Sequence, residues 1–194
     1  MATDNLEATL LAVFEDMRGH AKAEVLHKLA KATIGGDILE IGSHHGFGTI
    51  ALALGTGAGY KLPVYAVDYN RPTIVWTTET LYSQQDRFVF FQNLIDVGLC
   101  ADVNVVNLPM SRAARAWDAG SVGLLFWDPG LTVEGLVIDV LDAWATKIAP
   151  EGILAINDTE AGDLAVDRYI ENNLDEATWK RLRMRAGVRI VRRR

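Results

Sequence analysis

The sequence predicts an α/β protein in which a mostly parallel sheet carries helices on both faces, and three observations support this fold class. From about residue 37 onward, short apolar runs alternate with helix-like stretches. The chain has 194 residues, of which 49% are hydrophobic, enough for one buried core. No apolar run approaches the roughly 20 residues that cross a membrane. Strand–helix alternation in a chain of this length is typical of βαβ units that share one sheet.

The first 34 residues are predicted to be helical. Their apolar side chains recur at spacings of three and four, the period of an amphipathic helix: Leu6, Leu10, Phe14, Met17, Val25, Leu26 and Leu29. Gly35 and Gly36 end this pattern. We therefore expect residues 1–34 to form one or two helices that pack on a domain comprising residues 35–194.

Five short apolar runs are predicted to be strands, at residues 37–41, 64–68, 103–106, 122–127 and 153–156. Helical stretches lie between them at residues 49–54, 88–99 and 136–148. In sheets of this type, ligands bind beyond the carboxyl ends of the strands. The residues that follow each strand are therefore the first candidates for function.

The charge distribution separates an acidic body from a basic end. The formal net charge is -6, yet eight of the 19 basic residues lie from Lys180 onward, where there are no acids. An acidic body disfavours broad binding to a phosphate backbone. Leu182, Met184, Val188 and Ile190 alternate with polar residues around an Ala-Gly turn, which favours a closing hairpin of edge strands over a polybasic arm.

A glycine-rich turn follows the first predicted strand, with the sequence Glu40-Ile41-Gly42-Ser43-His44-His45-Gly46-Phe47-Gly48-Thr49. Such a turn from strand to helix brings backbone N–H groups close to a ligand. Its G-x-x-x-G-x-G spacing differs from the G-x-G-x-x-G of dinucleotide sites, which disfavours a nicotinamide or flavin dehydrogenase. A tight turn that binds nothing is the alternative.

Asp68 ends the second predicted strand, about 20 residues beyond the last glycine of the turn, where an acid can bind ribose hydroxyls. Taken singly, Asp68 is better explained as the cap of a following helix. The glycine turn and this acid together favour a ligand that contains a nucleoside.

These segments resemble a known enzyme family. Residues 38–49 are similar to the first motif of class I S-adenosylmethionine-dependent methyltransferases, and residues 65–68 to the second. The nearest resemblance is to the small O-methyltransferase-like branch that includes the catechol and macrocin O-methyltransferases. The segments similar, in order, to later parts of that branch are residues 91–94, 98–99, 124–128, 134–135, 139–144 and 149–159. The resemblance implies a Rossmann-like, seven-stranded, mostly parallel sheet that ends in an antiparallel C-terminal hairpin.

The resemblance also implies roles for individual residues. The turn would hold the amino-acid part of S-adenosylmethionine, Glu40 would brace the turn, and Asp68 would accept from the ribose hydroxyls. Met110 stands where the family usually has an acid near the adenine, so adenine recognition would rest on apolar packing. The implied donor-binding residues are Glu40, Gly42, Ser43, His44, Gly46, Gly48, Thr49, Asp68, Tyr69, Met110, Ser111 and Asp128.

Asp128 and Asp158 match the two carboxylates that hold Mg²⁺ in the cation-dependent members of the branch. A hard cation on carboxylate oxygens lowers the pKa of an acceptor hydroxyl. Two supporting positions differ from the family, because Leu131 replaces a Lys or His and Asn157 replaces a His. The alternative to metal binding is that Asp128 begins a turn and Asp158 caps a helix. The candidate catalytic residues are Asp128 and, as an alternative base in the glycine turn, His45.

The leading hypothesis is an S-adenosylmethionine-dependent methyltransferase acting on a small-molecule hydroxyl, with Mg²⁺ as a second, separable cofactor. The rivals are a catalytically impaired S-adenosylmethionine-binding protein and an amino-methyltransferase acting on nucleic acid or protein. The N-terminal acids and the single cysteine, Cys100, which we expect near the core, favour a cytoplasmic protein. The expected partner is a small-molecule acceptor rather than nucleic acid or a membrane. The sequence leaves a homodimer open.

Overall fold

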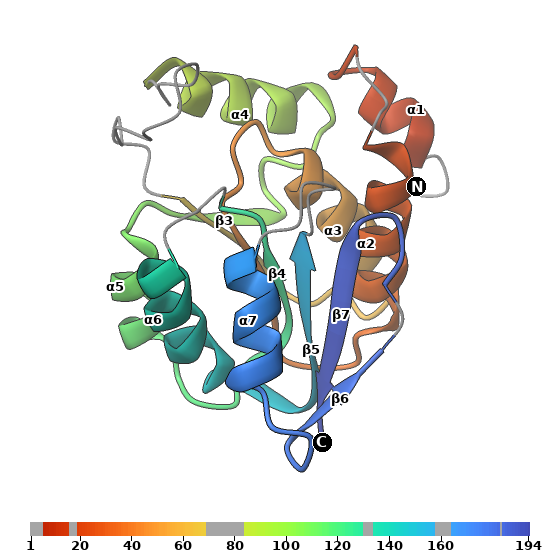
Figure 1. Cartoon of the computed structure of the whole chain (residues 1–194). Coiled ribbons are helices and arrows are strands. Elements are labelled where there is room, and N and C mark those ends of the chain that lie inside the picture. The colour runs from red at the N-terminus through yellow and green to blue at the C-terminus, as the bar shows by residue number, and fades with distance from the viewer. Residues whose placement is uncertain (1–5, 16–18, 69–83, 130–133, 158–163, 183) are drawn as a thin grey trace.

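The computed structural model shows a single seven-stranded sheet with helices on both faces (Figure 1). It describes residues 6–15, 19–68, 84–129, 134–157, 164–182 and 184–194. The strand order is β3-β2-β1-β4-β5-β7-β6. The first five strands are parallel to one another, whereas β7 is antiparallel to both β5 and β6. The predicted Rossmann-like fold with an antiparallel C-terminal hairpin is confirmed.

The strands occupy the predicted apolar runs, with one shifted boundary. Their bounds are β1 Asp37–Ile41, β2 Val64–Val67, β3 Val103–Val106, β4 Val122–Trp127, β5 Ile148–Asn157, β6 Trp179–Arg181 and β7 Val188–Arg193. β5 begins at Ile148, which the apolar period had assigned to the preceding helix. Ile148 pairs with Val122, and Ile153 pairs with Leu124. The pairing of β5 with β4 is irregular between these two pairs. For this reason the apolar run at residues 153–156 marks only the second half of β5.

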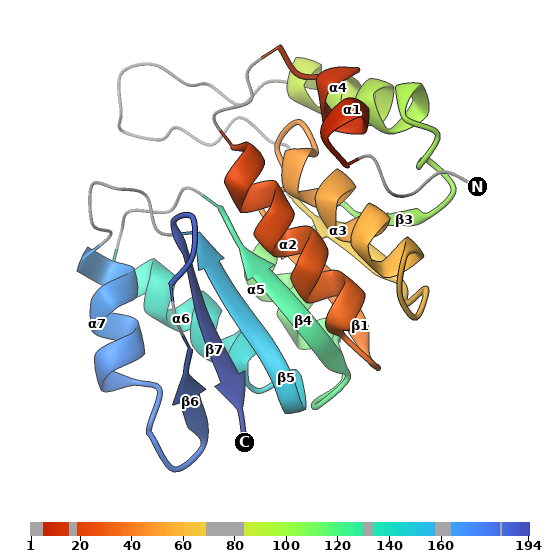
Figure 2. The ribbon, with the colours of Figure 1, turned by 90° about the vertical axis from the view of Figure 1, so that its right-hand side faces the viewer.

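Seven helices are seen in the described residues: α1 Leu6–Leu11, α2 His20–Ala32, α3 Phe47–Gly57, α4 Gln84–Asp96, α5 Met110–Ala116, α6 Glu134–Ala145 and α7 Leu164–Asn172. In the two ribbon views, α2 and α3 cover one face of the sheet and α5, α6 and α7 the other (Figures 1 and 2). None of these helices is long and apolar enough to span a bilayer. The sequence did not predict α5, because seven residues show too little of a helical period.

Each face of the sheet has its own apolar core. Leu39 and Ile41 of β1 pack with α5, α6 and α7, whereas Ile38 belongs to the opposite core with α2 and α3. Glu40 alternates with Leu39 and Ile41 along β1, and its carboxylate is bound by Thr49 of α3. Leu10 and Leu26 of the N-terminal helices are completely buried in the α2–α3 core.

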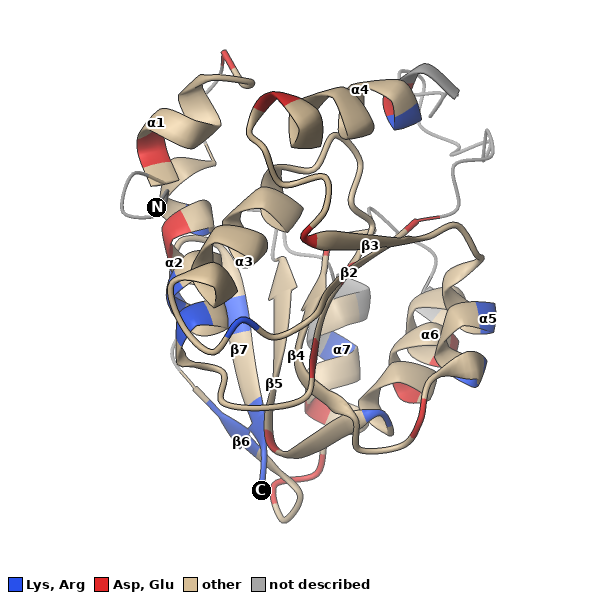
Figure 3. Cartoon of the chain, turned by 180° about the vertical axis from the view of Figure 1, so that it is seen from behind, with Lys and Arg blue, Asp and Glu red and all other residues tan. Residues whose placement is uncertain are grey.

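The basic C-terminal segment forms β-structure, as Figure 3 shows by the blue segments of β6 and β7. Ala186 and Gly187 both have positive φ, and Arg185 and Val188 pair across this turn. The predicted hairpin is therefore present, but two details differ. β7 lies between β5 and β6 rather than at the edge of the sheet. Met184, predicted to be half-buried in a strand, is 59% exposed because β6 ends at Arg181.

Cys100 also differs from expectation. It lies in the turn between α4 and β3 and is exposed rather than packed in or near the core. Its apolar neighbour Leu99 packs against the α2–α3 core instead.

Candidate active site

Three carboxylates meet where the strands β1, β2 and β4 end. Glu40 is the fourth residue of β1, Asp68 directly follows β2, and Asp128 directly follows β4. The parallel register places Val67 and Trp127 on either side of Ile41, so the two aspartates flank the start of the glycine turn. The backbone fixes this arrangement, since the Gly42 N–H donates to Val67 and the Asp128 N–H donates to Ile41.

The glycine turn is packed tightly against β4. Gly42 has φ +88°, and a Cβ atom there would lie 2.4 Å from the Cα of Pro129. Gly46 has φ +91°, and its N–H donates to the carbonyl of Ser43 over 2.7 Å. A Cβ atom on Gly48 would lie 2.1 Å from a carboxylate oxygen of Glu40. The turn therefore needs glycine to bring the start of α3 directly against the buried acid.

Glu40 braces the turn, as the resemblance implied. Its side chain is 2% exposed, and the Thr49 hydroxyl of α3 donates to its carboxylate. Burial raises the pKa of Glu40 well above its ordinary value, and the negative charges of Asp128 and Asp68 raise it further. Glu40 thus links the strand, the helix and the other two acids of the site.

Asp68 is held against the glycine turn. Its Oδ2 accepts a hydrogen bond from the backbone N–H of His44 over 3.1 Å. The two segments that the sequence linked as one candidate ligand site, 24 residues apart, are therefore in direct contact.

Asp128 is partly shielded from solvent. Burial raises its pKa to about 6, while Lys22 of α2 and the side chain of Asn157 act in the opposite direction. The Asn157 amide, at the end of β5, donates to Asp128 Oδ1 over 2.7 Å. The residue that departs from the family pattern at position 157 is thus the direct neighbour of this acid.

The remaining predicted residues fall into two groups. Ser43 is 5% exposed within the turn, and Met110 and Ser111 begin α5 after β3 and are partly buried. Tyr69, Leu131 and Asp158 lie outside the described residues. The pairing of Asp128 with Asp158 therefore stays a prediction.

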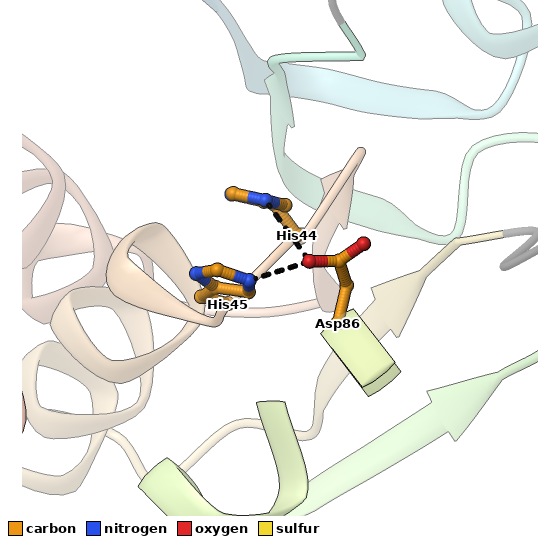
Figure 4. Close-up of side chains that lie close together, drawn as sticks. All are labelled: His44, His45 and Asp86. Carbon is orange, nitrogen blue, oxygen red and sulfur yellow. Dashed lines mark hydrogen bonds and ion pairs between the residues drawn. The ribbon is translucent and has the colours of Figure 1, made fainter. Parts of the chain in front are cut away.

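Sequence reasoning missed Asp86, the third residue of α4. Asp86 Oδ1 lies 2.8 Å from Nε2 of His45 and 3.8 Å from Nε2 of His44 (Figure 4). Burial lowers the pKa of His44, and the neighbouring His45 lowers it further. The Asn93 amide, also from α4, donates to the His45 carbonyl over 2.9 Å. Of these two α4 residues, the sequence pointed only to Asn93, because it lies in a segment similar to the methyltransferase family.

Comparisons with known proteins agree with this architecture. Residues 39–159 match the family model described as "Methyltransferase domain". This match spans more than half of the chain, so the protein belongs to the methyltransferase-domain family. The enzyme class expected from the sequence, an S-adenosylmethionine-dependent methyltransferase, is thereby confirmed. No curated protein sequence matches.

Several solved structures share the fold. The cofactor-bound Rv0187 from MTB has a TM-score of 0.68 at 19% identity, covering 97% of this chain and 89% of that one. The O-methyltransferase from Bacillus cereus in complex with SAH has a TM-score of 0.68 at 14% identity, with 100% and 93% covered. TomG, an O-methyltransferase from Streptomyces achromogenes involved in tomaymycin synthesis and bound to SAM, has a TM-score of 0.65 at 14% identity, with 96% and 89% covered.

Proposed function

We propose that this protein transfers a methyl group from S-adenosylmethionine to the hydroxyl of a small molecule. The observation that carries the proposal is the convergence of Glu40, Asp68 and Asp128 around a glycine turn at the carboxyl ends of the strands. Ligands of parallel α/β sheets bind at this edge. The O-methyltransferases from Bacillus cereus and Streptomyces achromogenes, which share the fold, were solved with SAH and SAM.

The chemistry of the three acids suits this donor. S-adenosylmethionine carries a positive sulfonium and a positive ammonium, whereas its amino-acid carboxylate supplies one negative charge. Carboxylates that crowd one another in a desolvated space have raised pKa values, and a bound cation offsets their repulsion. Burial raises the pKa of Glu40, and both aspartates raise it further, so a cation bound beside these acids would be favourable. In this proposal Asp68 accepts from the ribose hydroxyls, and the turn binds the amino-acid part.

The acceptor needs a base, and we assign that role to Asp128. In the reaction the acceptor O–H gives its proton to the Asp128 carboxylate, the oxygen forms a bond to the methyl carbon, and the sulfur–carbon bond breaks. The products are a methyl ether and S-adenosylhomocysteine. Burial is the main reason that Asp128 is a stronger base than an exposed aspartate, and Lys22 and Asn157 moderate the effect.

His45 is the second candidate base, and paired variants separate it from Asp128. Asp128→Asn keeps the hydrogen-bond acceptor for Asn157 and removes the base, so methyl transfer is expected to fall by roughly 10²–10⁴-fold. His45→Gln is expected to retain most of the activity. Transfer of labelled methyl groups to a panel of phenols and alcohols measures both. The reverse order of effects would assign the base to His45.

Mg²⁺ is a secondary part of the proposal. Asp128 and Asp158 would hold the ion, which lowers the pKa of a bound hydroxyl and orients it. The Asn157 amide already donates to Asp128 Oδ1. Activity that survives EDTA and Asp158→Ala would limit the mechanism to Asp128 alone, whereas loss in both cases supports the metal.

Asn157 also motivates the rival of a binding protein without turnover, because it replaces the His usual in the family. That rival predicts donor binding with no methyl transfer across the whole acceptor panel. An amino-methyltransferase acting on a polymer instead predicts salt-sensitive binding of nucleic acid or protein. The folding of the Arg-rich segment into β6 and β7 favours the small-molecule acceptor.

A further inference from the structure

A second cluster of ligand-type side chains lies beside the glycine turn, apart from the Asp128 carboxylate to which the proton of the acceptor is assigned. It consists of His44, His45 and Asp86, which offer two imidazole nitrogens and one carboxylate oxygen within 4.8 Å of one another (Figure 4). Asp86 Oδ1 is 2.8 Å from Nε2 of His45 and 3.8 Å from Nε2 of His44. Among the described residues it is the one group of this kind.

The backbone conformation at His44 places the two imidazole rings on the same side of the chain. Successive residues of extended backbone point to opposite sides, yet the His44 and His45 rings stack with centroids 3.7 Å apart. His44 has φ +42°, a left-handed conformation that is unfavourable for a residue other than glycine. This backbone turn directs both imidazoles toward the first turn of α4.

Contacts other than those of the three clustered side chains hold α4 in place. The Asn93 amide of α4 donates to the His45 carbonyl over 2.9 Å. Phe90 and Leu94 of the same helix are buried in the α2–α3 core. Asp86 is therefore presented to the two histidines by an element whose position is fixed by packing.

The donor set matches a borderline transition-metal ion. Zn²⁺ is bound by histidine nitrogen and carboxylate oxygen at about 2.0–2.2 Å, so tetrahedral ligand atoms lie about 3.3 Å apart. The separations of 2.8 and 3.8 Å lie on either side of that value. A site with three protein ligands leaves the fourth position for water or another ligand.

Charge and access also fit. Two neutral imidazoles and one carboxylate give a single negative charge, which a divalent ion more than balances. The side chains of His44, His45 and Asp86 are 45%, 33% and 19% exposed, so an ion can enter from solvent. Mg²⁺ fits poorly here, because it prefers oxygen ligands in an octahedral set.

We propose that His44, His45 and Asp86 form a Zn²⁺-type metal site, separate from the Asp128 carboxylate at which methyl transfer is assigned. The metal site does not depend on the proposed function. If both are correct, however, they are linked, because the His44 N–H that binds Asp68 belongs to a metal-ligating residue. A bound ion would also occupy His45 Nε2, which leaves the role of base to Asp128.

The test is a titration of the metal-free full chain with Zn²⁺ in competition with a chromophoric chelator. We expect one saturable site with a Kd below about 100 µM, and a Kd at least roughly tenfold higher in both His45→Ala and Asp86→Ala. X-ray absorption of the loaded protein is expected to show two imidazole nitrogens. Unfolding curves of the two variants establish that they are folded.

Two control variants exclude other Zn²⁺ ligands. His20→Ala removes a histidine that lies 3.9 Å from Glu24 on α2, and Cys100→Ser removes the exposed thiol. Both are expected to bind Zn²⁺ as the unaltered chain does. The proposal is overturned if no saturable site exists below about 100 µM, or if His45→Ala and Asp86→Ala change its Kd by less than tenfold.

Discussion

The Asp128 carboxylate is partly buried, and its pKa stays raised although two neighbouring groups lower it. The Asn157 amide donates to it over 2.7 Å, and Lys22 acts on it from α2, yet burial still raises its pKa to about 6. The group therefore holds a proton in the folded protein at a pH where the unfolded chain, with an ordinary pKa near 3.8, has lost it. Ionisation of Asp128 therefore lowers the free energy of unfolding, and this loss develops as the pH rises from about 4 to about 6.

We predict that Asp128→Asn stabilises the protein at neutral and alkaline pH. As pH rises from about 4 to about 6, the unfolded chain loses this proton first, so the wild type loses stability that the variant keeps. Above pH 6 the variant is expected to have a free energy of unfolding higher by roughly 1–3 kcal/mol. Denaturant unfolding from pH 3 to pH 8 measures the difference.

The pH profile distinguishes ionisation from packing. Asparagine has the same shape and still accepts from Asn157, so at pH 3 the two proteins are expected to be equally stable. A stability difference that is the same at every pH would contradict the assignment of a raised pKa to Asp128.

Among individual residues, the three acids of the candidate site could be predicted from the sequence, whereas the cluster of His44, His45 and Asp86 could not. Glu40, Asp68 and Asp128 could be predicted because each lies at the end of an apolar run, and parallel strands bring such ends together. Asp86 could not, because it lies 41 residues beyond His45 and only the packing of α4 brings them together. The catalytic and binding roles of all these residues stay predictions.

At the scale of elements, the junction between β1 and α3 depends on the close approach of Gly48 to Glu40. We predict that Gly48→Ala destabilises the protein by about 1–3 kcal/mol, because its Cβ would lie 2.1 Å from the buried carboxylate. Thermal or denaturant unfolding measures the loss. The substitution is also expected to weaken donor binding, since it displaces the start of α3.

Gly57 of the same helix provides a matched control. No atom lies within 4 Å of a Cβ built there, so Gly57→Ala should leave stability unchanged or raise it slightly. Equal destabilisation by the two substitutions would contradict a specific contact at Gly48.

The basic C-terminal segment is a structural element in this account. We predict that deletion of residues 189–194 abolishes cooperative unfolding, because these residues pair with both β5 and β6 and bury Ile190 and Val191. Arg189→Gln combined with Arg192→Gln removes two charges and keeps the strand, so this variant should fold. Circular dichroism and urea unfolding distinguish the two. A folded truncated chain would show that the segment is an arm.

The apolar pattern of the sequence predicts the parallel strands but not the start of β5 or the position of β7. The five parallel strands were predictable because buried strands form continuous apolar runs between helices. The start of β5 was missed because Pro150, Glu151 and Gly152 interrupt the run, with Glu151 at φ +64°. The interior position of β7 was missed because alternating Arg residues suggest an edge strand, whereas the order of pairing is set by the whole sheet.

At the scale of the whole molecule, net charge says little about the ligand, and the position of a few charges says more. The chain is acidic overall, with a formal net charge of -6. The acids that matter to the proposed function lie at one edge of the sheet, whereas many of the bases form the hairpin at its side (Figure 3). Membership of the methyltransferase-domain family, together with this edge, leads to the proposed donor.

Calorimetric titration with S-adenosylmethionine and S-adenosylhomocysteine, on the wild type and on Asp68→Asn, tests whether the glycine turn and Asp68 bind the proposed methyl donor. We expect one site for each ligand, with a Kd below about 100 µM. Asp68→Asn keeps an acceptor for the His44 N–H but loses the charged acceptor for the ribose, so affinity should fall by roughly 10–100-fold. Absence of binding at millimolar ligand, or equal affinity in the two proteins, would contradict the account.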